Sequence, residues 1–368
     1  FWLKPFRLQA APQPCGGHGR QRAGGRLPSD TLTAPCRAAL EASAERAGRP
    51  SRPMGGCWLG GALVAAVAVC LHRRSYQLFD FQVSVWLRGK QAYSRADVQA
   101  FLAEMAAAGG HWSEARGCLD AAAWHGVLHG LPRWGRFSQR WQDGVLSWLF
   151  LPSNLGTTNR FFVEFGFDSV GFSGKSDWGV FVGSNSRLLH DYFGWRGLLL
   201  DGEVEYPPDN QHQEFITPEN IVSLFDKYSV PKEADYVSID MDSCDVWVFL
   251  NLTVSYRPRV ISIEYNPEWP YGESKTVACT LPNGERFSWQ KDFLYGASFS
   301  AIAKAAGMRG YSVVAVVPAV DVFLVRKDLL CEGSAPGLET FRPHVAERVM
   351  HDAFPTKPEH RQKWEVDF

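Results

Sequence analysis

A glycine and an aspartate occupy positions where an α/β chain could bind a nucleotide. Gly166 directly follows the apolar run 161–165, and Asp201 ends a second apolar run about 35 residues later, the length of one strand–helix–strand unit. A residue without a Cβ permits a tight turn beside a ligand, and a carboxylate can accept hydrogen bonds from both ribose hydroxyls. We therefore predict that Gly166 and Asp201 bind a nucleotide-like cofactor. An ordinary buried strand with a turn glycine is the alternative.

Asp240 is the best candidate for a catalytic residue. It follows the apolar run 236–239, so its backbone is expected to be buried while its side chain emerges at the end of a strand. Ligands of open α/β sheets bind at the carboxyl ends of the strands. A carboxylate there could accept a proton from an acceptor hydroxyl. A solvated strand-end carboxylate or a helix cap is the alternative.

Asp240 and Asp242 also form a wider pattern with Glu264 and Asn266. Adjacent parallel strands would bring these side chains to one edge, and oxygen ligands from two strand ends suit Mg²⁺ or Ca²⁺. The simpler interpretation, which we favour from the sequence, is a polar rim hydrogen-bonded to loop amides. The sequence thus leaves a divalent metal open and assigns no metal ligand. Asp245 is expected to cap the helix that begins beside it.

The elements that must position these residues alternate along the chain from residue 160 onward. We expect helices near 185–193, 218–228, 245–253 and 298–307, and strands at 161–165, 197–201, 213–216, 235–240, 259–264, 312–317 and 320–326. Thr217 followed by Pro218 is a typical helix start. Such alternation predicts a parallel sheet with helices on both faces.

The last two strands must form a hairpin. Only Pro318 and Ala319 separate them, and a parallel crossover needs a much longer connection. The predicted fold class is therefore α/β: a doubly wound, Rossmann-like seven-stranded sheet, mostly parallel with an antiparallel last strand, preceded by a helical segment. Such a sheet is typical of S-adenosylmethionine-dependent methyltransferases rather than of nicotinamide dehydrogenases.

A set of segments, in the same order, resembles FkbM-type proteins of the class I methyltransferase-like family. The likeness covers about residues 160–330, nearly half of the chain, and its segments are 162–167, 183–185, 194–202, 215–221, 235–242, 257–266, 295–298 and 321–326. The resemblance implies a methyltransferase fold and S-adenosylmethionine as the cofactor. It does not imply a particular substrate.

The resemblance also implies roles for four residues. Gly166 would let the backbone approach the cofactor, and Glu164 would hold the amino-acid portion of the cofactor through water. Asp201 would bind the ribose, with Glu203 as a second candidate. The sequence therefore points to O-methylation of a small-molecule, glycan or lipid acceptor.

The glycine loop departs from the family pattern. A typical loop reads Glu-x-Gly-x-Gly-x-Gly, whereas Asp168 and Val170 stand at the second and third glycine positions here. This departure motivates a second hypothesis from another class: a non-catalytic, methyltransferase-like binding or scaffold protein anchored to a membrane.

The regions outside 159–330 carry weaker signals. Residues 1–53 are rich in Gly, Pro, Arg and Ala and are expected to be disordered. Within 54–74, an uncharged run at 55–71 spans roughly 25 Å as a helix, which predicts a single-pass N-terminal membrane anchor; a cleaved signal and a buried soluble helix are the alternatives. The sequence does not indicate which compartment the domain faces.

Two further regions flank the domain. Residues 75–158 are expected to form a helical lead-in, with helices over 95–108 and 112–126, and 331–368 an irregular tail.

Composition excludes some classes of function. The chain has 368 residues, 45% of them hydrophobic, which allows a sizeable core. Its net charge is −1, and no basic stripe occurs in the α/β part, so a primary nucleic-acid binder is excluded. The eight cysteines include no CxxC pair and no zinc-type spacing with histidine.

Overall fold

A computed structural model describes most of the α/β region and parts of its surroundings. The described residues are 103, 117–121, 124–125, 137–151, 153–166, 171–172, 183–290, 292–345 and 356–368. The expectations for 1–53 and 54–74 lie outside them, and those for helices over 95–108 and 112–126 lie largely outside. Within the described residues, no helix has both the length and the apolar character to cross a membrane.

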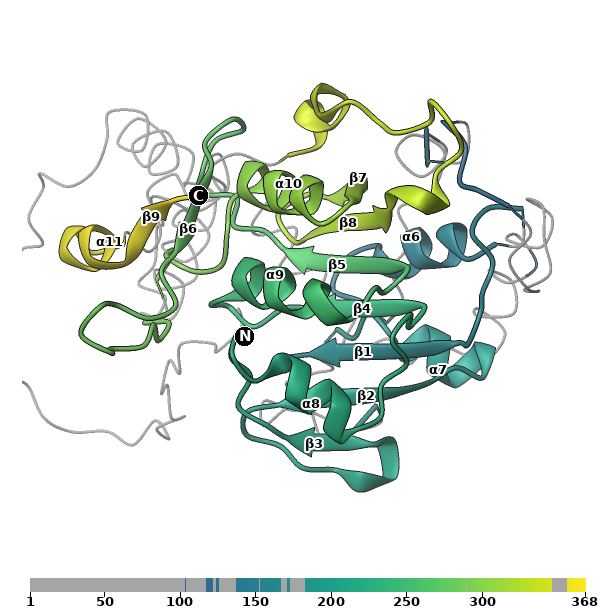
Figure 1. Ribbon diagram of the computed structural model, residues 1–368, viewed down its shortest axis with the longest axis horizontal. Helices are drawn as coiled ribbons and strands as arrows, with labels where there is room; N and C mark the ends of the chain where they lie inside the picture. The colour runs from purple at the N-terminus through teal and green to yellow at the C-terminus, as the bar shows by residue number, and fades with distance from the viewer. Residues whose placement is uncertain are drawn as a thin grey trace, which may run out of the picture. The chain divides into compact units, whose positions relative to one another are not determined.

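Seven strands form one mixed sheet (Figure 1). Their order across the sheet is β3-β2-β1-β4-β5-β8-β7, and the strands are β1 (Phe161–Phe165), β2 (Arg196–Asp201), β3 (Gln211–Gln213), β4 (Tyr236–Ile239), β5 (Val260–Glu264), β7 (Tyr311–Val317) and β8 (Asp321–Arg326). The pairs from β3 to β5 are parallel, and β8 pairs antiparallel with both β5 and β7. The predicted mostly parallel α/β sheet with an antiparallel last strand is confirmed.

Helices cover both faces of the sheet. In Figure 1, α8 (Ile221–Lys227), α9 (Asp245–Ser255) and α10 (Phe299–Met308) lie in front of it, whereas α6 (Gln142–Leu149) and α7 (Arg187–Phe193) lie behind. Two separate clusters of buried apolar side chains match this division, because successive residues of a strand point to opposite faces. Val163 packs with the first group of helices and Phe162 with the second.

The third strand and the helix after it differ most from expectation. The strand was expected at 213–216 but occupies Gln211–Gln213, and α8 begins at Ile221 rather than near 218. The intervening residues form the entry to the helix: the Asn220 side chain donates to the Phe215 carbonyl, and its Oδ1 accepts from the Thr217 amide at 2.8 Å. These bonds keep 215–220 out of the hydrogen bonding of the sheet, so β3 ends at Gln213.

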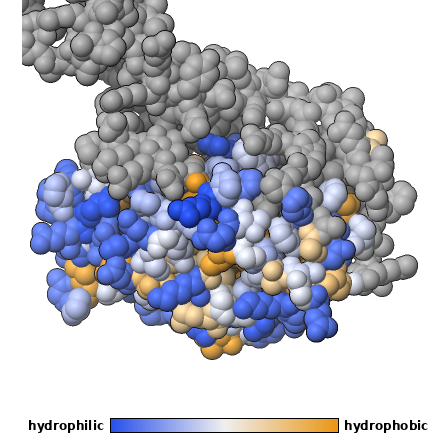
Figure 2. Space-filling view, turned by 90° about the horizontal axis from the view of Figure 1, so that it is seen from above, coloured by the Kyte–Doolittle hydropathy of each residue, from blue (hydrophilic) through white to orange (hydrophobic). Residues whose placement is uncertain are grey.

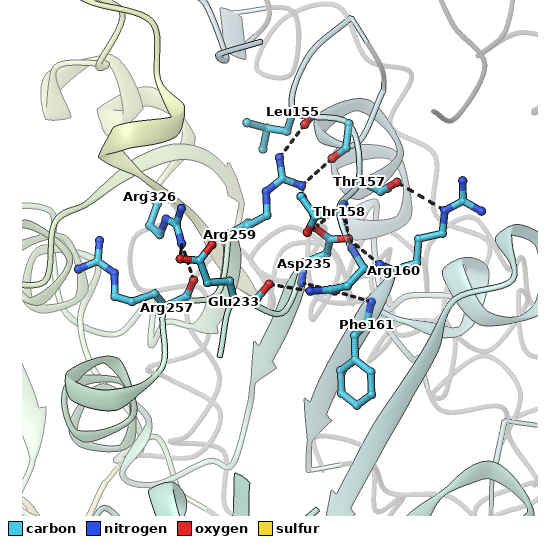
Figure 3. Close-up of polar contacts among 12 residues, drawn as sticks. Leu155, Thr157, Thr158, Arg160, Phe161, Glu233, Asp235, Arg257, Arg259 and Arg326 are labelled. Atoms are coloured by element: carbon cyan, nitrogen blue, oxygen red, sulfur yellow. Dashed lines mark hydrogen bonds and ion pairs between the residues drawn. The ribbon is translucent and has the colours of Figure 1, made fainter. Parts of the chain in front are cut away.

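A buried ion pair lies at the amino ends of the parallel strands (Figure 3). Arg259 Nη1 lies 2.7 Å from Asp235 Oδ1. The two residues directly precede β5 and β4, and both are almost fully buried. Asp235 also accepts from the backbone amides of residues 158–160, and Arg259 donates to the carbonyls of Leu155 and Gly156. The pair therefore fixes the segment that leads into β1.

The segment 331–368 is more regular than expected. It contains a 3-10 helix η3 (Leu338–His344), a helix α11 (Pro358–Trp364) and a strand β9 (Glu365–Asp367). β9 pairs antiparallel with β6 (Lys275–Val277), which lies outside the main sheet. Trp364 packs with Trp269 and Phe287, so an apolar contact that the tail's composition does not reveal holds this end of the chain in place.

Two disulfides join distant parts of the chain. Cys118 pairs with Cys331 across 213 residues, and Cys244 pairs with Cys279 across 35. Two short 3-10 helices, η1 (Pro207–Asp209) and η2 (Lys327–Leu329), complete the described elements. On the face of the molecule in Figure 2, hydrophilic residues dominate the described surface and apolar residues lie in small separate patches.

Candidate functional site

A cavity of about 350 Å³ lies at the carboxyl ends of β1, β2 and β4. Strands β1 and β4 are neighbours in the sheet although β2 and β3 intervene in the chain, so the strand order reverses here. Open α/β sheets bind ligands at such a point, because the loops after the two strands diverge. The cavity is lined by Gln139, Gln142, Glu164, Phe165, Gly166, Gly183, Asn185, Leu200, Asp201, Gly202, Glu203, Glu214, Phe215, Ile216, Ser238, Asp240, Met241, Asp242 and Ser243. It thus brings together all five residues predicted to bind cofactor or act in catalysis.

Gly166 has a structural reason to be glycine. Its φ is +67°, and its amide donates to the Leu200 carbonyl at 3.1 Å. A Cβ added here would lie 1.9 Å from the backbone carbonyl oxygen of Asp240. The glycine therefore lets the turn after β1 approach the turn after β4, two protein segments that together form the cavity wall.

Glu164 holds the entry to α7. Its carboxylate accepts hydrogen bonds from the Asn185 amide at 2.7 Å, the Ser184 hydroxyl at 2.9 Å, and both the amide and the hydroxyl of Ser186. Burial raises the pKa of Glu164, and the hydrogen bonds from these residues oppose that shift. Its predicted contact with a cofactor remains a prediction.

Asp201 and Glu203 lie at the end of β2. The Asp201 Oδ1 accepts from the amides of Glu203 and Val204, at 2.7 and 2.9 Å, so the side chain shapes the turn that carries Glu203. Asp201 is buried and Glu203 is exposed. Both line the cavity, and their contact with a ribose stays a prediction.

The cavity combines an apolar part with an acidic part. Phe215, which is 68% exposed, lies with Leu200, Ile216 and Met241 in its lining. No Lys, Arg or His occurs among the described residues of the lining, whereas six acids do: Glu164, Asp201, Glu203, Glu214, Asp240 and Asp242. Such a lining favours a ligand with a flat apolar part and positive charge.

Three carboxyl groups meet at the ends of β4 and β5. One carboxylate oxygen each from Asp240, Asp242 and Glu264 lie within 4.8 Å of one another. Burial raises the pKa of Asp240, and burial together with the charge of Asp240 raises the pKa of Asp242 to about 7. Burial, together with the negative charges of four aspartates, of which Asp240 has the largest effect, holds the pKa of Glu264 well above its ordinary range. The strand-end pattern in the sequence thus located a real cluster.

Two polar side chains beside this cluster form hydrogen bonds with the loops that follow β4 and β5. The prediction that Asp245 caps the helix is wrong: Asp245 is the first residue of α9, the N-cap is Cys244, and no side chain caps the helix. The Asp245 carboxylate instead accepts from the Met241 amide at 2.8 Å and the Ser243 amide at 3.0 Å, in the turn before the helix. Asn266 donates to the carbonyls of Phe293 and Tyr295 and accepts from the Glu268 amide. Asn266 was grouped with the three acids from its position after β5, but its side chain is committed to this loop.

Sequence reasoning missed a buried network beside the cavity. The Asp321 carboxylate, at the start of β8, accepts from Gln142 of α6 at 2.9 Å and from Asn185 at 3.3 Å, and Asn185 also donates to Ser238. Burial, with the charge of Asp240, raises the pKa of Asp321 to about 7. The pairing of β8 with β5 puts Asp321 opposite Glu264, the last residue of β5, and the predicted hairpin of β7 and β8 does not by itself specify that pairing.

Comparison with known proteins adds no assignment: the sequence matches no family model and no curated protein. The resemblance to FkbM-type methyltransferases therefore rests on the residues quoted above and stays a prediction.

Proposed function

We propose that the chain is an S-adenosylmethionine-dependent methyltransferase that methylates an oxygen of a small molecule, glycan or lipid. The observation that carries the proposal is the acidic and apolar cavity at the reversal point between β1 and β4. The sheet supports it, because helices on both faces and an antiparallel last strand between β5 and β7 are typical of the doubly wound, Rossmann-like fold of class I methyltransferases.

The residues present fit this cofactor. S-adenosylmethionine carries a flat adenine, a ribose with two hydroxyls, and a cationic sulfonium beside an amino-acid group. Phe215, Ile216 and Met241 offer an apolar surface for the adenine, and Asp201 and Glu203 offer carboxylates for the ribose. The remaining acids favour the positive charge. A volume of about 350 Å³ lies within the range of small-molecule sites.

When bound, the cofactor would supply a methyl group to an oxygen of the acceptor by in-line attack at the methyl carbon, with S-adenosylhomocysteine as the leaving group. The protein's part is to position the acceptor and to take its proton. Asp240 lines the cavity and is partly buried, and burial raises its pKa, which makes its carboxylate a stronger base. The backbone of Asp240 lies directly against the turn at Gly166, so this turn limits where the carboxylate can be placed.

Calorimetry with S-adenosylmethionine and S-adenosylhomocysteine tests the proposal. The wild-type chain should bind both. Asp201→Asn keeps an oxygen for the amides of Glu203 and Val204 but removes the charge, so it should lose at least one charge-assisted hydrogen bond of about 1.5–3 kcal/mol and weaken binding about tenfold or more. Asp226→Asn, an exposed carboxylate paired with Lys232, is the matched control and should bind like wild type. Absence of binding by wild type would sink the proposal and favour a non-catalytic scaffold.

Asp240→Asn tests the second half of the proposal. It should keep cofactor binding and melt within a few degrees of wild type, as expected for a change below about 1 kcal/mol. Transfer of a labelled methyl group to a glycan or lipid extract should fall about a hundredfold or more if Asp240 is the base. A much lower melting temperature of Asp240→Asn would instead indicate that Asp240 has a structural role.

A further inference from the structure

The three-carboxyl cluster has polar atoms that the protein leaves without partners. Asp242 and Glu264 are 7% and 5% exposed, and Asp242 Oδ1 and Glu264 Oε2 have no hydrogen-bond partner among the described residues. Both side chains, with Asp240, direct an oxygen into a space no more than 4.8 Å across. Buried polar groups without a partner destabilise a protein, so their retention requires an explanation.

Structural roles do not explain the cluster. The loop amides after β4 are already bonded to Asp245, and Asn266 holds the loop after β5. In the part of the chain that the structure describes, none of the ion pairs involves Asp240, Asp242 or Glu264. Carboxyl groups this close repel one another when ionised, and they need either shared protons or a cation between them.

We propose that Asp240, Asp242 and Glu264 bind one hard divalent cation, Mg²⁺, Mn²⁺ or Ca²⁺, beside the cavity that Asp240 and Asp242 line. All three ligands are carboxylate oxygens, which these ions prefer, whereas zinc sites are built mainly from Cys and His. The cation would replace the shared protons and satisfy the two oxygens that lack partners.

Such a site would stay open toward the cavity. Three carboxylates fill three of the six to eight positions that these ions use. Asp240 and Asp242 line the cavity, so water or the oxygen atoms of a ligand would complete the coordination from that side. With a cation bound, the Asp240 carboxylate would be a ligand, so its proposed role as a base applies to the protein without the cation. Cation binding itself does not depend on methyl transfer.

Mn²⁺ binding tests the inference on the whole chain with its disulfides intact. Electron paramagnetic resonance counts free Mn²⁺, and titration should give one site with a Kd below about 1 mM, displaced by Ca²⁺ or Mg²⁺. The melting temperature should rise with Mn²⁺ concentration, since the ion binds only the folded state. Glu264→Gln and Asp242→Asn should each weaken Mn²⁺ binding at least about tenfold, because one of three charged ligands is lost. Glu339→Gln, a largely exposed glutamate, should bind like wild type.

Two results would overturn the inference: no site below about 1 mM in wild type, or unchanged affinity in both ligand variants while circular dichroism shows them folded. If both variants unfold, anomalous scattering from a crystal grown with Mn²⁺ decides, because an ion more than about 3 Å from these oxygens is incompatible with the site. No cofactor is present in these measurements, so a failure to bind S-adenosylmethionine leaves them unaffected, and a failure to bind Mn²⁺ leaves the cofactor test unaffected.

Discussion

Replacing Gly166 by alanine should destabilise the protein and displace Asp240, whereas the same change at Gly194 should only destabilise it mildly. The two glycines have nearly the same backbone angle, with φ of +67° and +66°. Alanine in this left-handed conformation costs about 1–2 kcal/mol at either position. The surroundings differ: an added Cβ meets the Asp240 carbonyl oxygen at 1.9 Å at Gly166, and nothing within 4 Å at Gly194, which ends α7.

The difference between the variants measures the contact between the two turns. Ordinary carbon–oxygen contacts begin near 3.4 Å, so the Asp240 backbone must move by roughly 1.5 Å to accept the methyl group. Overpacking of this kind costs about 1–3 kcal/mol beyond the backbone strain. For a domain of this size, that extra cost lowers the melting temperature of Gly166→Ala by roughly 2–12 °C relative to Gly194→Ala.

Thermal unfolding followed by circular dichroism, under non-reducing conditions, gives the stability difference. Titrations with Mn²⁺ and S-adenosylhomocysteine give the effect on the site, and both should weaken in Gly166→Ala but not in Gly194→Ala. If the two variants melt within about 1 °C of each other, the turn that carries Asp240 moves aside without a measurable loss of stability. The close approach would then not be the reason that glycine follows β1.

The other predictions concern the buried ion pair, the buried acids and the N-terminal segment. Arg259→Met leaves the buried Asp235 without its ion-pair partner and should cost about 3–5 kcal/mol in urea unfolding, whereas Arg342→Met, at an exposed pair, should cost less than about 1 kcal/mol. The folded state raises the pKa of Asp321 from 3.8 to about 7, so it binds a proton that the unfolded chain has released, and stability must fall as pH rises through this window. Asp321→Asn in EDTA should flatten that fall by up to about 1.4 kcal/mol per pH unit, and an unchanged slope would contradict the assignment. Deleting 54–74 should move the protein from the membrane to the soluble fraction without changing its melting temperature; wild-type protein that is soluble without detergent would contradict the anchor.

The sheet was predictable where apolar runs were long and was not where the strand was polar. β1, β2, β5 and β8 lie within a residue or two of their expected positions, because each is a buried run ended by a turn or a charge. β3 has the sequence Gln-His-Gln, which carries no strand signal, and its position depends on pairing with β2.

The candidate site was predictable only as far as parallel strand ends could place it. Asp240 and Glu264 follow neighbouring parallel strands, so their proximity could be inferred. Asp321 could not be placed the same way, because it starts an antiparallel strand whose position between β5 and β7 the sequence leaves open. The pairing of the cysteines could not be predicted from the sequence either, because eight cysteines allow 105 complete pairings.

The place of β8 in the sheet has a consequence for how the chain is made. β8 is the last strand of the main sheet in the chain, yet it lies between β5 and β7, and Cys331, which pairs with Cys118, follows it five residues later. During synthesis the edge of β5 that β8 covers therefore stays unpaired until the hairpin of β7 and β8 has left the ribosome. Unpaired edges recruit other strands, so this interval is when the nascent chain is most prone to aggregate and most in need of a chaperone. Truncations that end before residue 321 should accordingly yield insoluble protein rather than a smaller folded domain.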